Sequence, residues 1–146
     1  MQLSKNRILY IEDHDDTREL VSLLLRQHGF DVITGSTIES GIDLAVTGTF
    51  DLYLLDSWLP DGSGLDLCRK IREFDQHTPI LFYSAAAYEM DRELALQSGA
   101  QAYLVKPSET SELCLLVSLL IEEFRNRVEV TSTELDGRQS AQAIPS

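Results

Sequence analysis

The stretch LYLLDSWLPDGSG, from Leu52 to Gly64, places an aspartate directly after a short apolar run. Residues 52–55 are all apolar, Asp56 follows at once, and proline and glycine break the chain soon afterwards. The simplest interpretation is structural, because aspartate often closes a turn by accepting hydrogen bonds from the backbone that follows it. A functional interpretation requires other reactive side chains to reach the same place. The ends of the other apolar runs therefore decide between the two interpretations.

The chain is strongly acidic. It has 146 residues, with 12 Lys and Arg against 24 Asp and Glu, which gives a formal charge of -12. This length suffices for one domain with a substantial core. The negative charge repels phosphate backbones and anionic membrane surfaces. No apolar run approaches the roughly 18 residues that a membrane span needs. We therefore expect a cytoplasmic protein that binds neither nucleic acid directly nor membranes.

Short apolar runs alternate along the chain with longer segments of helical periodicity. The predicted strands lie at residues 8–11, 32–33, 52–55, 80–83 and 102–105, and helices are predicted after each, the fifth from about 111 to 127. Most of the strand runs lack polar alternation, which is typical of parallel strands buried on both faces. This pattern predicts an α/β fold with a doubly wound, five-stranded parallel sheet. The binding crevice of such a fold lies beyond the carboxyl ends of its strands.

Reactive side chains follow four of the five predicted strands. Glu12 and Asp13 come after the first strand, Asp56 after the third, Ser84 after the fourth and Lys106 after the fifth. Turn-forming residues alone would give a mixture of Gly, Asn, Pro and Ser at these positions. The carboxyl ends of parallel strands meet at one edge of the sheet, so these acids, the hydroxyl and the amine are expected to converge. This pattern favours a functional role for Asp56.

The chain resembles the receiver domain of two-component response regulators over residues 6–127. The resemblance is carried by ILYIED, LYLLDSWLPDGSG, LFYSA and YLVKP, which occur in this order and at suitable spacing. It implies a flavodoxin-like (βα)5 fold with strand order 2-1-3-4-5. It also implies a phosphoacceptor switch rather than an enzyme, in which Asp56 receives a phosphoryl group from a sensor histidine kinase or a phosphotransfer protein.

The acidic cluster implies a divalent metal. Three carboxylates that converge raise one another's pKa unless a cation intervenes, and Mg²⁺ prefers oxygen ligands and keeps several waters or phosphate oxygens. The resemblance assigns direct ligation of Mg²⁺, or of Mn²⁺, to Asp13 and Asp56. It gives Glu12 a water-mediated or supporting contact, and it makes the backbone carbonyl of Trp58 the third protein ligand.

Three further positions take roles from the resemblance. Lys106 would stabilise the charge of the transferring phosphoryl group, and its bond to Pro107 would be cis. Ser84 would donate a hydrogen bond to the phosphoryl oxygen. Tyr103 would turn inward together with Ser84 as a switch. The switch would change the surface formed by the fourth helix, the fifth strand and the fifth helix.

The fifth predicted helix is unusually apolar. Every residue from Leu113 to Ile121 is apolar except Ser118, whereas a helix that covers one face of a sheet needs only an apolar stripe. Part of this helix is therefore expected to remain exposed and to bind a partner. Receivers often form homodimers through this face, so a homodimer is one expectation. Deeper burial of the helix is the alternative.

Two questions of organisation stay open at the level of sequence. Residues 1–127 are predicted to form the receiver domain, and residues 128–146 are predicted to be a disordered polar tail or linker. The chain is interpreted either as a stand-alone regulator or as a receiver from a larger regulator or hybrid kinase. A haloacid-dehalogenase-like phosphatase is a further alternative, but its motif places a second aspartate where Trp58 stands.

Overall fold

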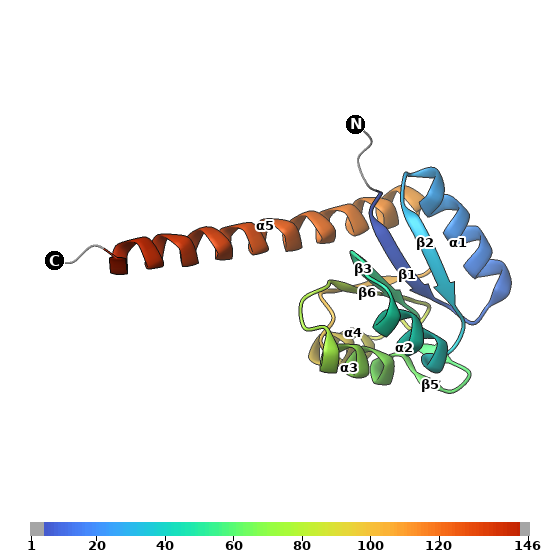
Figure 1. The fold of residues 1–146 in the computed structure, drawn as a ribbon. Coiled ribbons are helices and arrows are strands. Elements are labelled where there is room, and N and C mark those ends of the chain that lie inside the picture. Colours follow the sequence, from blue (N-terminus) through green and yellow to red (C-terminus); the bar gives the residue numbers. More distant parts are fainter. Residues whose placement is uncertain (1–4, 144–146) are drawn as a thin grey trace.

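The computed structural model describes residues 5–143, and its core is a five-stranded parallel sheet (Figure 1). The order of the strands is β2-β1-β3-β6-β7, which is the predicted 2-1-3-4-5 order, because β4 and β5 belong to a separate hairpin. The strands of the sheet are β1 (Arg7–Ile11), β2 (Asp31–Gly35), β3 (Leu52–Leu55), β6 (Ile80–Ser84) and β7 (Ala102–Val105). The predicted fold class is confirmed.

Five helices cover the two faces of this sheet. They are α1 (Asp15–Gln27), α2 (Ile38–Thr47), α3 (Gly64–Phe74), α4 (Glu89–Gln97) and α5 (Thr110–Ala143). One core cluster joins the sheet to α2, α3 and α4, and a second joins it to α1 and α5. Residues 52–55 are buried on both faces, which explains why this strand lacks polar alternation.

Short-range capping fixes where the helices begin. The Nδ1 atom of His14 accepts a hydrogen bond from the backbone N–H of Thr17 at 3.2 Å, so α1 starts directly after the first strand's acids. The hydroxyl of Ser63 accepts from the N–H of Leu65 at 3.1 Å and starts α3. Such caps satisfy backbone donors that a helix leaves unpaired at its first turn. Both helices therefore begin at the edge of the sheet that carries the polar side chains.

A small hairpin follows the strand that ends at Asp56. It consists of β4 (Trp58–Leu59) and β5 (Gly62–Ser63), which pair antiparallel. Asp61 lies in its turn, and its carboxylate accepts hydrogen bonds from the N–H groups of Ile38 and Glu39 at 2.8 and 3.1 Å. These bonds lower the pKa of Asp61. The hairpin is thereby attached to the first turn of α2.

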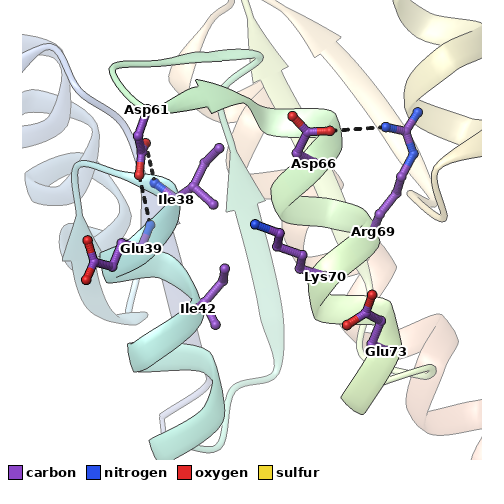
Figure 2. A pocket seen from close by; sticks show the side chains of 8 residues that line it. All are labelled: Ile38, Glu39, Ile42, Asp61, Asp66, Arg69, Lys70 and Glu73. Carbon is purple, nitrogen blue, oxygen red and sulfur yellow. Dashed lines mark hydrogen bonds and ion pairs between the residues drawn. The ribbon is translucent and has the colours of Figure 1, made fainter.

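A groove of about 480 Å³ lies between α2 and α3, beside Asp61. Figure 2 shows Lys70 pointing from α3 into this groove, while Arg69 pairs with Asp66 at 3.3 Å. The groove carries charges of both signs and lies outside the acidic cluster described below.

The last helix is longer than predicted. It runs to Ala143, whereas the sequence predicts an end near Arg127 and a disordered tail at residues 128–146. Figure 1 shows its final turns extending away from the sheet. Elongating an existing helix adds one hydrogen bond per residue, which is far easier than nucleating a new one, and the first proline after Thr110 is Pro145. Residues 144–146 lie outside the described part of the chain. No helix among the described residues is long and apolar enough to cross a membrane.

Candidate functional site

Three carboxylates converge at the carboxyl edge of the sheet. Glu12 and Asp13 follow β1, and Asp56 follows β3, which pairs with β1 in parallel register. Each of the three offers a ligand oxygen, and these oxygens all lie within 4.8 Å of one another. Glu12 is 1% exposed and Asp56 is 9% exposed, whereas Asp13 is open to solvent. The predicted convergence of these acids is confirmed.

Lys106, the residue that follows β7, joins this acidic cluster. Its ammonium group binds Glu12 Oε1 and lies 3.8 Å from Asp56 Oδ2, and its side chain is only 16% exposed. The same ammonium group stands 5.3 Å from the centre of the Tyr83 ring. Burial and the neighbouring Asp56 raise the pKa of Glu12, and Lys106 opposes this rise. Lys106 is thus shared between two carboxylates and is not an exposed surface lysine.

Asp56 is held at this edge by its backbone. Its N–H donates to the carbonyl of Ile11 at 3.1 Å, which continues the ladder between β3 and β1. Its Oδ1 accepts from the N–H of Ser57 at 2.7 Å. A Cβ atom at Gly64 would lie 2.0 Å from the carbonyl oxygen of Asp56, so only glycine fits there. The glycine at the start of α3 therefore lets the helix approach the backbone of Asp56.

Ser84 and Tyr103 meet at the backbone of Ala86. The hydroxyl of Ser84, which is fully buried, accepts from the N–H of Ala86 at 3.1 Å. The Tyr103 hydroxyl donates to the Ala86 carbonyl at 2.6 Å and lies 3.4 Å from the hydroxyl of Ser57. The Tyr103 ring is buried and stacks on Phe82, with ring centres 6.0 Å apart.

The position of Tyr103 bears on the predicted switch. The side chain points inward in this structure, and its movement on phosphorylation stays a prediction. The stacking on Phe82 and the hydrogen bond to Ala86 explain this arrangement, because both hold the ring against the sheet.

Two further predictions concern the backbone near the acids. The peptide bond between Lys106 and Pro107 is cis, as predicted. Trp58 stands in β4, two residues after Asp56, with its side chain 69% exposed. The proposed use of its backbone carbonyl as a metal ligand stays a prediction.

The donor set of this edge fits a hard divalent cation. Glu12, Asp13 and Asp56 are carboxylates, and the acidic cluster contains neither histidine nor cysteine. Mg²⁺ favours oxygen ligands and binds through one or two carboxylates, with water or phosphate oxygens completing its octahedron. An exposed Asp13 leaves room for these other ligands. The residues present therefore suit Mg²⁺ better than zinc or another soft metal.

Sequence reasoning missed three residues of this region. Gly64 is required by a backbone approach that the sequence does not display, although its place at the end of the quoted stretch hinted at a turn. His14 caps α1 and donates its own N–H to Glu12 Oε2 at 3.4 Å. Tyr10 is fully buried in β1, and burial raises the pKa of its hydroxyl. An apolar strand pattern gives no signal for a buried hydroxyl.

The doubly wound sheet, with acids and a lysine at its carboxyl edge, is the architecture of a receiver domain. Residues 8–118 match the response regulator receiver domain family, so the chain belongs to that family of two-component signalling proteins. The relatives and the solved structures below show the same family.

The curated relatives are transcriptional regulators. The chain is 35% identical over 113 residues to the transcriptional regulatory protein DltR of Streptococcus agalactiae, covering 77% of this chain and 50% of that protein. It is 33% identical over 124 residues to the cell cycle transcriptional regulator CtrA of Caulobacter vibrioides, covering 84% of this chain and 53% of the relative. The chain thus spans about half the length of the curated relatives it matches.

Solved receiver domains share the fold. The receiver domain of a sensor histidine kinase from Pseudomonas aeruginosa is 29% identical, has a TM-score of 0.76, and aligns over 82% of this chain and 99% of its own. That structure holds a magnesium ion in its active site cleft. The HemR receiver domain of Leptospira biflexa is 32% identical, has a TM-score of 0.75, and aligns over 80% of this chain and 94% of its own.

Proposed function

We propose that this receiver domain is a phosphoacceptor switch in which Asp56 accepts a phosphoryl group. The observation that carries the proposal is the convergence of three carboxylates and Lys106 at one edge of the sheet. Membership of the receiver family supports it and leaves the haloacid-dehalogenase-like alternative without support. In this proposal the domain assists its own modification, and it does not turn over a substrate as an enzyme.

The proposed reaction is a phosphoryl transfer to a carboxylate. An oxygen of Asp56 attacks the phosphorus, and an O–P bond forms. The bond from phosphorus to the imidazole nitrogen of the donor breaks, and that nitrogen keeps the electron pair. Lys106 stabilises the negative charge on the equatorial oxygens, since it already lies 3.8 Å from Asp56. Ser84 accepts from Ala86, so its own hydrogen is free to donate to a phosphoryl oxygen.

The proposed cofactor is Mg²⁺, with Mn²⁺ as a substitute of the same coordination. When bound, it supplies positive charge that offsets the charge of the phosphoryl oxygens. Asp13 and Asp56 would ligate it directly, Glu12 would support it, and the Trp58 carbonyl would complete the protein ligands. The oxygen-rich donor set supports this assignment, as does the magnesium ion in the Pseudomonas aeruginosa relative.

The proposed donors are a sensor histidine kinase or a phosphotransfer protein, acting in the cytoplasm. The curated relatives are transcriptional regulators about twice the length of the matched region. We propose that this domain itself does not bind DNA, because its formal charge of -12 repels a phosphate backbone. A receiver that belongs to a larger regulator or a hybrid kinase would use the same site.

Acetyl phosphate tests the proposal without knowledge of the kinase. The chain is incubated with acetyl phosphate with and without Mg²⁺, and its intact mass is measured. We expect the mass of one phosphoryl group to be added, and only in the presence of the metal. An unchanged mass with Mg²⁺ present, while a known receiver is modified under the same conditions, would contradict the proposed function.

The proposed output surface is formed by α4, β7 and α5. Large apolar side chains are exposed on all three elements, namely Met90, Leu96, Val105, Leu115 and Leu119. Other residues of the apolar segment of α5 are buried against the sheet, Val117 completely. The expectation that part of this segment remains exposed is therefore confirmed. Large exposed apolar side chains often mark a partner site where they gather on one surface.

Self-association through this surface is expected to depend on the phosphoryl group. Leu119 is 51% exposed, so Leu119→Asp should place a charge in the interface and abolish any dimer that wild type forms with beryllofluoride. Sedimentation velocity with and without beryllofluoride measures the association state. Leu23→Asp on α1, where Leu23 is 52% exposed, is the matched control. Wild type that stays monomeric in both conditions would point to a separate partner protein instead.

Trp58 is expected to slow the loss of the phosphoryl group. Its large, exposed side chain stands two residues after Asp56, where it can limit the approach of water. Trp58→Ala should increase the rate of dephosphorylation several-fold, measured by the decay of the phosphorylated mass after the phosphodonor is removed. Phe74→Ala is the control, because this half-exposed aromatic residue lies at the far end of α3. Equal decay rates in wild type and Trp58→Ala would refute the shielding role.

A further inference from the structure

Arg18 binds the loop that carries two of the three acids. It lies in the first turn of α1, and its Nη1 donates to the carbonyl of Glu12 at 2.8 Å. A longer contact of 3.5 Å joins the same nitrogen to the carbonyl of Asp13. The side chain is only 21% exposed, so the guanidinium lies against the loop. One side chain therefore connects the start of the helix to the backbone of both acids.

The guanidinium of Arg18 is itself held in place. Its Nη2 pairs with Oδ1 of Asp15 at 2.6 Å, and the backbone N–H of Arg18 donates to the carbonyl of His14 at 2.9 Å. A planar guanidinium can make several such bonds at once in a fixed geometry. Helix stability does not call for a cation here, because the first turn of a helix favours acidic side chains. The contacts with the loop explain the position of Arg18 better than the helix does.

Asp13 is the acid that depends most on this loop. The carboxylate of Glu12 binds Lys106, and that of Asp56 accepts from the N–H of Ser57. The Asp13 side chain is exposed, and none of the side chains described at residues 5–128 pairs with its carboxylate. The place of this carboxylate in the acidic cluster is therefore set by the backbone that carries it.

We propose that Arg18 is a positioning residue for the metal, holding the loop so that the carboxylate of Asp13 stays within reach of Asp56. This inference rests on the proposed function, in which these two acids ligate Mg²⁺. The ligand oxygens of the acidic cluster lie within 4.8 Å of one another, and without metal the carboxylates repel. A loose loop would let Asp13 move away from the others. A fixed loop removes the cost of reordering it when the metal binds.

The sign of the effect separates positioning from electrostatics. A guanidinium beside the site repels a divalent cation, so charge alone predicts tighter Mg²⁺ binding once Arg18 is removed. Positioning predicts the reverse, because the loss of a group that orients metal ligands weakens metal binding by about 10- to 100-fold. A fall in Mg²⁺ affinity on removal of this positive charge is therefore diagnostic of positioning.

Arg18→Met tests the inference, because methionine keeps an unbranched side chain and removes every donor. Isothermal calorimetry measures the binding of Mg²⁺ to the whole chain. Hydrogen exchange at residues 12–17 is measured on the metal-free protein. We expect the Mg²⁺ affinity to fall about tenfold. We also expect faster exchange in this segment, since the loop loses the bonds that hold it.

Arg26→Met is the matched control. Arg26 lies on the same helix and also donates to a backbone carbonyl, that of Val32 at 2.9 Å, outside the acidic cluster. This variant should keep the Mg²⁺ affinity of wild type and its exchange at residues 12–17, even if its melting temperature falls. If Arg18→Met does not fold, Arg18→Lys should still bind Mg²⁺ more weakly than Arg26→Lys, because lysine keeps the charge and loses the planar fork.

Two results would overturn the role of Arg18. One is Mg²⁺ binding by Arg18→Met that is equal to that of wild type or tighter. The other is a fall in affinity without faster exchange at residues 12–17, because the effect would then not act through the loop. If wild type itself does not bind Mg²⁺, the proposed metal site fails and this inference fails with it. If wild type binds Mg²⁺, only the role of Arg18 is in question.

Discussion

Asp56→Asn is expected to abolish phosphorylation by acetyl phosphate. An asparagine preserves the shape of the side chain but removes the anionic oxygen that attacks phosphorus. It also removes one carboxylate from the cluster with Glu12 and Asp13. Intact mass measured over time should show one added phosphoryl group on wild type and none on the variant.

Asp66→Asn is the matched control for this experiment. Asp66 is an exposed aspartate on α3 that pairs with Arg69 and lies outside the acidic cluster. This variant should be modified as fully as wild type. A phosphoryl group on Asp56→Asn in the same yield as on wild type would exclude Asp56 as the acceptor.

The second large effect concerns the metal. Binding of Mg²⁺ to the native state alone adds stability that grows with the metal concentration, about 2.7 kcal/mol at 100 times the dissociation constant. For a domain of this size that corresponds to a rise in melting temperature of roughly 10 °C. Asp13→Ala should remove this rise, because Asp13 is a proposed direct ligand. Because the Asp13 side chain is exposed, we expect the variant to fold, so that a lost response to Mg²⁺ reports on the metal site.

Stability without metal gives an independent readout of the same variant. Asp13→Ala removes one of three mutually repelling carboxylates, so the metal-free variant should be at least as stable as metal-free wild type. Asp16→Ala on α1 removes an exposed acid outside the cluster and should keep the full response to Mg²⁺. The proposed metal site is wrong if Mg²⁺ leaves the melting temperature of wild type unchanged. It is also wrong if the melting temperature of Asp13→Ala rises as much as that of wild type.

The sheet could be predicted from the sequence because its strands are buried on both faces. Four of the five strand runs are nearly continuous apolar segments, and each is followed by a helical period. The elements that were not predicted form for reasons other than hydrophobic periodicity. The hairpin of β4 and β5 has strands of two residues, which are too short for a hydrophobic pattern. The C-terminal part of α5 is polar, so its helicity follows from elongation of the preceding turns and not from periodicity.

The acidic cluster could be predicted because topology alone brings the ends of parallel strands together. Glu12, Asp13, Asp56 and Lys106 needed only the correct strand assignments. The conformation of Tyr103 could not be predicted in this way, since its inward position depends on stacking and on one carbonyl in a loop. Single hydrogen bonds of this kind are set by tertiary packing, which leaves no trace in the local sequence.

The closeness of Gly64 to the carbonyl of Asp56 also bears on how this loop can diverge. Every side chain larger than hydrogen would collide with that oxygen, so position 64 tolerates no substitution even though it takes no part in the chemistry. The exposed residues between these two positions, such as Pro60, face no such limit. The loop can therefore change at Pro60 more readily than at Gly64. Its length is limited in the same way, because an insertion or deletion between Asp56 and Gly64 would have to preserve this close approach of two backbones.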